Sequence, residues 1–229
     1  MGKRRLIGKI VILMLGLAAV VILAANSDTI PVSTHKKGYR VVIDPGHGGS
    51  DCGAVGVSGV KEAGLNLAVS LYLKEELEAL GMEAILTRSD ERALAEGKKA
   101  DMAARGKIMN GEGVDLVVSV HMNKFTDPSV HGPMAFYMKG SAEGEKLAKT
   151  VIDSITDELG APRRIANPGD YYVIRESMPV SVLVECGFLS NSGDEALLQQ
   201  EQHQKKLAHA IARGIFSYFE GDLGRKPLD

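Results

Sequence analysis

Three short runs rich in valine and isoleucine each lead into a polar residue, and stretches with helical spacing of apolar residues separate them. The runs are residues 39–44, 115–120 and 180–185. Continuous apolar runs of this length are typical of strands buried on both faces, as in parallel sheets covered by helices. The alternation predicts an α/β fold, with a mostly parallel central sheet flanked by helices on both faces in a three-layer sandwich.

The remaining elements are expected to continue this alternation. Helices are predicted at about 62–80, 98–110, 143–159 and 201–219, and further strands at 82–87, 134–138 and 171–174. In such sheets the site lies beyond the carboxyl ends of the strands. His47, His121 and Glu185 lie at or just after three strand ends, so we expect them to meet at one edge of the sheet.

The length of 229 residues suits one domain, which we place at residues 39–220, with a polar tail at 221–229. Residues 1–25 begin with basic residues and continue into an apolar run, as an export signal does. This segment is expected to be a signal peptide or a membrane anchor, joined to the domain by a linker at 26–38. The protein is therefore predicted to be exported, with membrane contact only through residues 1–25.

The charge of the expected domain argues against nucleic acid as a partner. Residues 1–25 hold four basic and no acidic residues, so without them the formal net charge changes from −2 to −6. Contacts to phosphates need a clustered basic surface. The two cysteines, Cys52 and Cys186, could form one bridge in an exported protein, but we expect free, partly buried thiols.

A catalytic zinc site typically has three histidine or carboxylate ligands and an open position. His47 and His121 follow strand ends, and Glu62 begins the first predicted helix after a loop that can fold back over the sheet edge. These three residues are the candidate zinc ligands. A carboxylate in the first helical turn also suits the helix dipole, which is the alternative explanation for Glu62.

Glu185 is then the carboxylate left beside the metal. It could accept a proton from the attacking water and pass it to a leaving amine, which predicts amide hydrolysis without a covalent intermediate. The alternative is a structural carboxylate that caps the turn at 187–191. Asn123 and Arg175 are candidate substrate contacts, or else solvated loop residues. Among the other histidines, only His131 is placed where it could line a cleft.

Four motifs in order resemble the zinc-dependent N-acetylmuramoyl-L-alanine amidase family (amidase type 3). They are Asp-Pro-Gly-His-Gly-Gly at 44–49, the helix start with Lys61, Glu62 and Asn66, Ser-Val-His-Met-Asn at 119–123, and Val-Glu-Cys-Gly-Phe-Leu-Ser-Asn at 184–191. The resemblance spans about residues 39–219. It implies zinc held by His47, Glu62 and His121, a catalytic Glu185, and cleavage between the muramic lactyl group and L-alanine in peptidoglycan.

Within the family, the chain is most similar to the germination-specific CwlD-type amidases of spore-forming bacteria. This similarity implies action on spore cortex peptidoglycan, as a step toward muramic-δ-lactam formation, and an activating protein partner. Two alternatives remain open: another zinc hydrolase of the wall, such as a carboxypeptidase, or a non-catalytic peptidoglycan-binding protein of the same fold. A glycosidase with paired carboxylates is disfavoured because the two histidines would then have no role.

Overall fold

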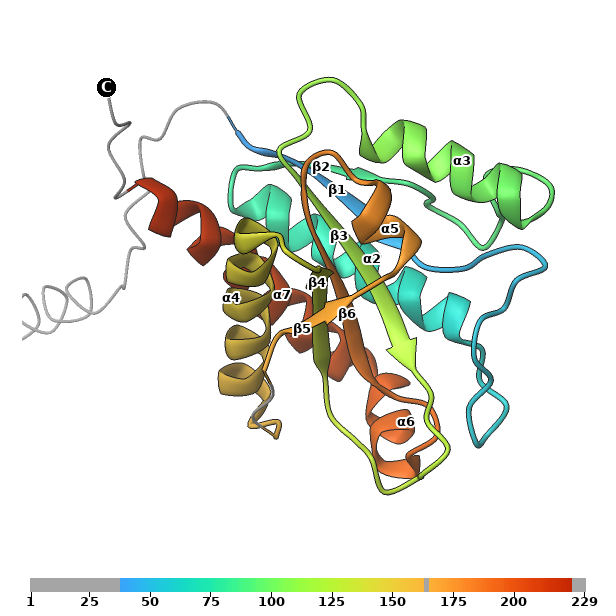
Figure 1. The fold of residues 1–229 in the computed structure, drawn as a ribbon. Helices are drawn as coiled ribbons and strands as arrows, with labels where there is room; N and C mark the ends of the chain where they lie inside the picture. The colour runs from blue at the N-terminus through green and yellow to red at the C-terminus, as the bar shows by residue number, and fades with distance from the viewer. Residues whose placement is uncertain (1–37, 163–164, 224–229) are drawn as a thin grey trace, which may run out of the picture. The chain divides into compact units, whose positions relative to one another are not determined.

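A six-stranded sheet forms the centre of the computed structural model, which describes residues 38–162 and 165–223 (Figure 1). The strands are β1 (Arg40–Pro45), β2 (Glu83–Leu86), β3 (Leu116–Asn123), β4 (Met134–Met138), β5 (Asn167–Gly169) and β6 (Val180–Phe188), in the order β2-β1-β3-β6-β4-β5. Strands β2, β1, β3 and β6 are parallel, whereas β4 runs antiparallel to β6 and β5 parallel to β4. The predicted mostly parallel sheet is confirmed.

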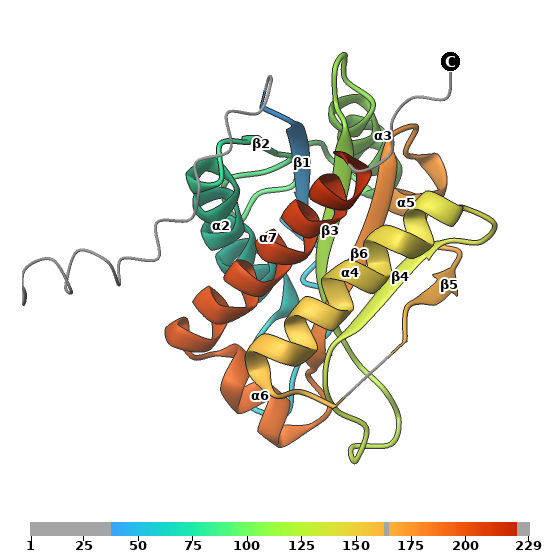
Figure 2. The same ribbon diagram turned by 90° about the vertical axis from the view of Figure 1, so that its left-hand side faces the viewer.

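Helices cover both faces of this sheet, as predicted (Figure 2). Helices α2 (Glu62–Ala79), α4 (Ala142–Leu159) and α7 (Glu201–Leu223) lie on one face, where α7 packs against both α2 and α4. Helices α3 (Lys98–Met109) and α5 (Tyr172–Glu176) lie on the other face, against β1 and β6. Helix α6 (Ser192–Leu198) follows β6 and leads into α7. The result is a three-layer sandwich.

The two faces of the sheet differ in chemistry because successive side chains of a strand point to opposite sides. Val182, Val184 and Cys186 of β6 join the large apolar core under α2, α4 and α7. Leu183 and Glu185, between them, line a pocket on the side of α3 and α5. The polar residues that end the central strands therefore belong to one face of the sheet.

The prediction of a strand at 171–174 is wrong. This segment forms α5, and Val173 packs with Val42 and Val117 against the sheet face. Strand β6 is paired with β3 on one side and with β4 on the other, so residues 171–174 have no free strand edge beside β6 to pair with. The short β5, at the edge beside β4, was not predicted.

Two further helices differ from expectation. Helix α6 was not predicted, although Asn191 caps it by accepting hydrogen bonds from the backbone N–H groups of Gly193 and Asp194. Helix α7 continues to Leu223, into the expected polar tail. The expected export segment at 1–25, most of the linker and residues 224–229 lie outside the described residues.

Cys52 and Cys186 are free thiols, as expected, with Cys186 buried. No helix within residues 38–162 and 165–223 is both long enough and apolar enough to cross a membrane.

Candidate metal and hydrolase site

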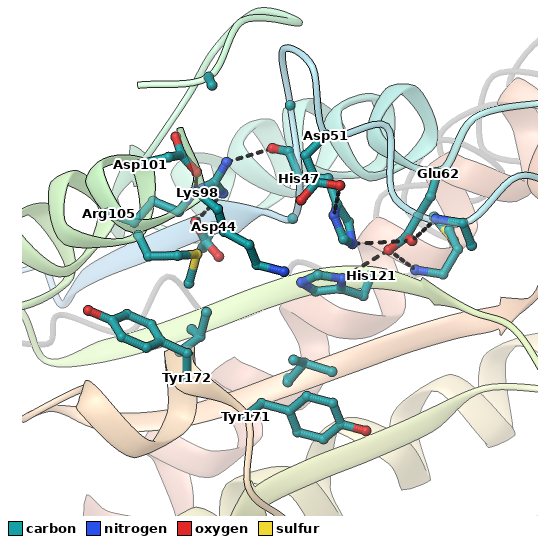
Figure 3. A pocket seen from close by; sticks show the side chains of 18 of the residues that line it. Asp44, His47, Asp51, Glu62, Lys98, Asp101, Arg105, His121, Tyr171 and Tyr172 are labelled. Atoms are coloured by element: carbon teal, nitrogen blue, oxygen red, sulfur yellow. Dashed lines mark hydrogen bonds and ion pairs between the residues drawn. The ribbon is translucent and has the colours of Figure 1, made fainter. Parts of the chain in front are cut away.

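A pocket with a volume of about 690 Å³ opens at the carboxyl ends of β1, β3 and β6 (Figure 3). Its floor is the polar face of the sheet, and its walls come from the loop after β1, the start of α3 and the start of α5. His47, Glu62, His121 and Glu185 all line it. The structure therefore brings together the polar groups that the sequence places at separate strand ends.

His47, Glu62 and His121 form a compact cluster in this pocket (Figure 3). Glu62 bridges the two rings, because its Oε2 lies 3.3 Å from His47 Nε2 and its Oε1 lies 2.9 Å from His121 Nδ1. The rings meet edge to face, with centroids 5.0 Å apart. Each side chain comes from a different element: His47 from the loop after β1, Glu62 from the first residue of α2, and His121 from β3.

Backbone and side-chain donors fix the orientation of the Glu62 carboxylate. Its Oε2 accepts a hydrogen bond from Ala54 N at 2.7 Å, and its Oε1 accepts from Asn66 Nδ2 at 3.1 Å and Met122 N at 3.2 Å. Burial alone would raise the pKa of Glu62, but hydrogen bonds from His121 and His47 outweigh burial and hold this pKa well below its usual range. Glu62 is therefore an ionised carboxylate with a fixed orientation, as suits a candidate metal ligand.

Two glycines allow the backbone to approach the cluster. A Cβ at Gly53, where φ is +66°, would lie 2.5 Å from Glu62 Oε2, and a Cβ at Gly46 would lie 2.2 Å from His121 Cε1. Contacts this short do not occur, so both positions exclude side chains. The glycine-rich loop thus allows close packing around the cluster.

The cluster fits a divalent metal ion of the zinc type. One ligand atom from each of the three residues lies within 4.8 Å of the others. Two imidazoles and one carboxylate are the donor set of many catalytic zinc sites, with room left for a further ligand. The hydrogen bonds to Glu62 supply the second shell that such ligands usually have.

Glu185 lies beside the cluster. In the parallel ladder between β3 and β6 it is paired with His121, so both side chains point to the same face. Its side chain is buried, and its Oε2 has no hydrogen-bond partner among the described residues. Burial raises the pKa of Glu185 to about 7, with the charge of His121 opposing this shift and that of Glu62 adding to it. Such a carboxyl can take up and release a proton near neutral pH.

The two expected substrate contacts have different positions. Asn123 lines the pocket, next to a break in the β3–β6 register. Arg175 does not line it: its guanidinium pairs with Asp170 and Glu176 on the exposed side of α5. The geometry therefore gives no support to Arg175 as a substrate contact. His131 is likewise absent from the pocket lining.

Several residues near the pocket were not singled out from the sequence. Lys98 begins α3 and its ammonium points across the pocket toward His121 (Figure 3). Tyr171 lies on the opposite wall. Arg88 and Arg105 lie beneath the loop that carries His47. The position of Arg88 directly after a predicted strand was a usable signal, whereas Arg105 resembled one of many cations on a helix.

Known proteins resemble this chain in sequence and in fold. The family model described as N-acetylmuramoyl-L-alanine amidase matches residues 41–217. The germination-specific N-acetylmuramoyl-L-alanine amidase of Bacillus subtilis is 32% identical over 203 residues, which cover 85% of each chain. Among solved structures, the CwlD amidase of Clostridioides difficile, in complex with the GerS lipoprotein, is 31% identical with a TM-score of 0.77 and covers 81% of this chain and 100% of that one.

The catalytic domain of CwlV from Bacillus (Paenibacillus) polymyxa var. colistinus is 33% identical, with a TM-score of 0.72. The match covers 80% of this chain and 98% of that one. The family match at residues 41–217 includes the segments that carry His47, Glu62, His121 and Glu185. The chain belongs to the N-acetylmuramoyl-L-alanine amidase family.

Proposed function

We propose that this amidase is zinc-dependent and cleaves the amide bond between the lactyl group of N-acetylmuramic acid and L-alanine in peptidoglycan. The observation that carries the proposal is the His47–Glu62–His121 cluster with a buried carboxyl, Glu185, directly beside it. The three residues of the cluster would hold the metal. Zinc bound there would supply the Lewis acidity that polarises an amide carbonyl and makes water nucleophilic near neutral pH.

Glu185 is the proposed proton carrier. It takes a proton from the attacking water while the water oxygen bonds to the carbonyl carbon. It then delivers that proton to the amide nitrogen as the carbon–nitrogen bond breaks, so L-alanine leaves as a free amine. The position of Glu185 beside the cluster, with its Oε2 free of hydrogen-bond partners among the described residues, suits both steps, because that oxygen can receive and return the proton. No covalent intermediate with the protein is needed.

The rest of the pocket is proposed to bind the glycan and the stem peptide. Asn123 offers an amide for hydrogen bonds to peptide groups. Tyr171 offers an aromatic face and a hydroxyl, and the Lys98 ammonium can attract a carboxylate of the stem peptide. All three residues line the same pocket as the cluster and Glu185, so they could contact a substrate whose amide lies beside Glu185.

The similarity to the germination-specific amidase of Bacillus subtilis supports a role in spores. We propose that the substrate is cortex peptidoglycan and that the cut prepares muramic-δ-lactam formation. Because the related Clostridioides difficile amidase was solved with a lipoprotein, we also propose a protein partner for this chain. Residues 1–25 are proposed to export the domain, as a cleaved signal or as an anchor, so that it acts outside the cytoplasm.

Digestion of purified peptidoglycan tests this function. The protein with one equivalent of zinc should release stem peptides with an L-alanine amino terminus and leave free lactyl carboxyl groups on muramic acid. Cortex and vegetative peptidoglycan are compared, each with and without a candidate lipoprotein partner. Cleavage within the stem peptide would identify a carboxypeptidase instead, and binding without any cleavage would identify a non-catalytic binding protein.

A further inference from the structure

Two buried guanidinium groups hold three consecutive carbonyl groups of the loop that carries His47. Arg105 donates from Nη1 to Pro45 O at 2.7 Å and from Nη2 to His47 O at 2.5 Å. Arg88 donates from Nε to Pro45 O at 3.0 Å and from Nη2 to Gly46 O at 2.7 Å. The backbone from Pro45 to His47 is therefore held by hydrogen bonds from the two guanidinium groups.

The two arginines are themselves anchored to rigid elements. Arg105, in α3, pairs with Asp44 Oδ1 at 2.8 Å and with Asp101 Oδ2 at 2.7 Å, and its side chain is almost fully buried. Arg88 also donates to Ala63 O at 2.9 Å, which is the second residue of the helix that begins with Glu62. Arg88 thus links the loop of one candidate ligand to the helix of another.

The loop needs such restraint because of the backbone of His47. Its φ is +61°, and it is the one residue other than glycine with a positive φ in the part of the chain that the structure describes. Residues other than glycine rarely adopt this left-handed backbone conformation, so His47 would leave it if the loop were unrestrained. In this conformation the imidazole Nε2 lies 3.3 Å from Glu62 Oε2.

Burying two cations side by side is costly, which argues against a role in packing alone. Burial and the charge of Arg105 lower the pKa of Arg88 to about 10, although Asp44 acts in the opposite direction. Apolar side chains could fill the same space without this penalty. What apolar side chains cannot do is donate several hydrogen bonds in fixed directions to adjacent carbonyl groups.

We propose that Arg88 and Arg105 are positioning residues that hold His47 in its left-handed conformation and thereby set the affinity of the protein for zinc. The inference rests on the proposed function, because it takes zinc as the occupant of the His47–Glu62–His121 cluster. Neither arginine is assigned a contact with the metal or the substrate.

The test compares Arg105→Lys and Arg88→Lys with the unaltered protein. A lysine keeps the charge but cannot donate to two separate carbonyl groups in the fixed geometry of a guanidinium. We expect the zinc dissociation constant, measured by competition with a chelator, to rise about 10- to 100-fold in each variant, as second-shell changes typically cause. The visible absorption spectrum of the cobalt-substituted protein should also change, because the ligand geometry around the metal is disturbed.

Ile155→Val is the matched control for stability. Ile155 is fully buried in the core on the opposite face of the sheet and contacts none of the cluster. This variant should lower the melting temperature of the metal-free protein and leave the zinc dissociation constant and the cobalt spectrum unchanged. If the arginine variants lose stability but keep both metal readouts at their unaltered values, the proposal is wrong. Arg88→Lys decides the question if Arg105→Lys does not fold.

Failure of this inference can be told apart from failure of the proposed function, because zinc affinity is measured without turnover. A protein that binds zinc tightly but cuts no amide would refute the proposed function and leave the arginine test valid. Arginine variants with unchanged zinc affinity would refute the inference and leave the amidase reaction standing.

Discussion

At the scale of single residues, the chemistry depends on two carboxyl groups in one pocket that are held in opposite states. Glu62 is oriented by three N–H donors, and although burial alone would raise its pKa, its hydrogen bonds with His121 and His47 keep that pKa low. Glu185 is buried with one oxygen unpartnered, which keeps its pKa high. Environments that separate the pKa values of two carboxyl groups in this way fit the proposed roles, in which Glu62 binds a cation and Glu185 moves a proton.

Replacing Glu185 by glutamine should greatly slow turnover and spare the metal. The amide keeps the shape of the side chain but cannot accept and return a proton, so we expect kcat to fall about 10²- to 10⁴-fold. Zinc content, measured on the dialysed protein, should stay at one equivalent. Glu195→Gln is the matched control, because Glu195 is also buried but binds Ser58 outside the pocket. Loss of zinc from the Glu185 variant would instead make Glu185 a ligand.

The same variant should change how the stability of the metal-free protein depends on pH. The folded pKa of Glu185, about 7, exceeds the ordinary value of 4.5 for the unfolded chain. Below pH 4.5 both states are protonated, and between pH 4.5 and 7 only the unfolded state loses its proton, so this group lowers stability as pH rises. Relative to Glu185→Gln, the unaltered protein should lose up to about 3 kcal/mol between pH 5 and pH 8. Urea unfolding at both values measures the difference, and equal pH slopes for the two proteins would rule out a raised pKa.

In acid, the titration of Asp44 should change the stability of the fold in the opposite direction to that of Glu185. Burial alone would raise its pKa, but the charge of Arg105 and the hydrogen bond from Thr87 together lower it. A carboxyl with a lowered folded pKa adds stability above its ordinary pKa of 3.8, and this stability is lost as pH falls further. Asp44→Asn should therefore be less stable than the unaltered protein at pH 6, with a smaller difference at pH 2–3. A difference that does not depend on pH would contradict the assigned pair with Arg105.

At the scale of elements, helices and strands supply three of the four candidate site residues, Glu62, His121 and Glu185. Glu62 opens α2, and β3 and β6 bring His121 and Glu185 together in one register. Only His47 comes from a loop, and that loop is held by two arginines. The helices on the opposite face contribute packing, and α4 and α7 approach each other closely at Gly214.

Gly214→Ala should destabilise the fold without altering the site. A Cβ at Gly214 would lie 2.6 Å from Val151 Cα and 2.9 Å from Thr150 O, so α7 must shift away from α4. Overpacking of this kind typically costs about 1–3 kcal/mol. Gly221→Ala is the control in the same helix, because nothing lies within 4 Å of its added Cβ. A fall in zinc affinity with Gly214→Ala would show that the two faces of the sheet are coupled.

Most elements could be predicted from the sequence because apolar spacing is strong where a face is buried. The helices with regular spacing and the buried strands were found, whereas residues 171–174 were misassigned as a strand because a short apolar run fits a strand or a helix equally well. The candidate ligands were recognisable because each directly follows a strand or begins a helix. Arg105 was not, since its role comes from tertiary contacts with carbonyl groups about sixty positions away in the chain.

At the scale of the whole molecule, the proposed metal would join segments that are far apart in the sequence. His47, Glu62 and His121 belong to the β1 loop, α2 and β3, and an unfolded chain does not hold them together. Zinc should therefore bind the folded domain in preference to the unfolded chain and stabilise it. Free zinc at 100 times its dissociation constant adds about 2.7 kcal/mol to the free energy of unfolding.

Thermal unfolding measures this linkage. The melting temperature should rise by several degrees with zinc and fall again with a chelator. His121→Ala should lose the rise, whereas His209→Ala should keep it, because His209 is exposed on α7 and pairs with Glu76 away from the pocket. A rise that survives His121→Ala would place the stabilising metal elsewhere.

The central claim is that zinc at this cluster, with Glu185 beside it, cuts the bond between muramic acid and L-alanine. Mass spectrometry of cortex peptidoglycan digested by the zinc-loaded protein, with a candidate lipoprotein partner present, tests it most directly. The expected products are muramic acid with a free lactyl carboxyl group and stem peptides that begin with L-alanine, and both should be missing with Glu185→Gln. Intact lactyl–alanine bonds after digestion, with or without shortened stem peptides, would contradict the account.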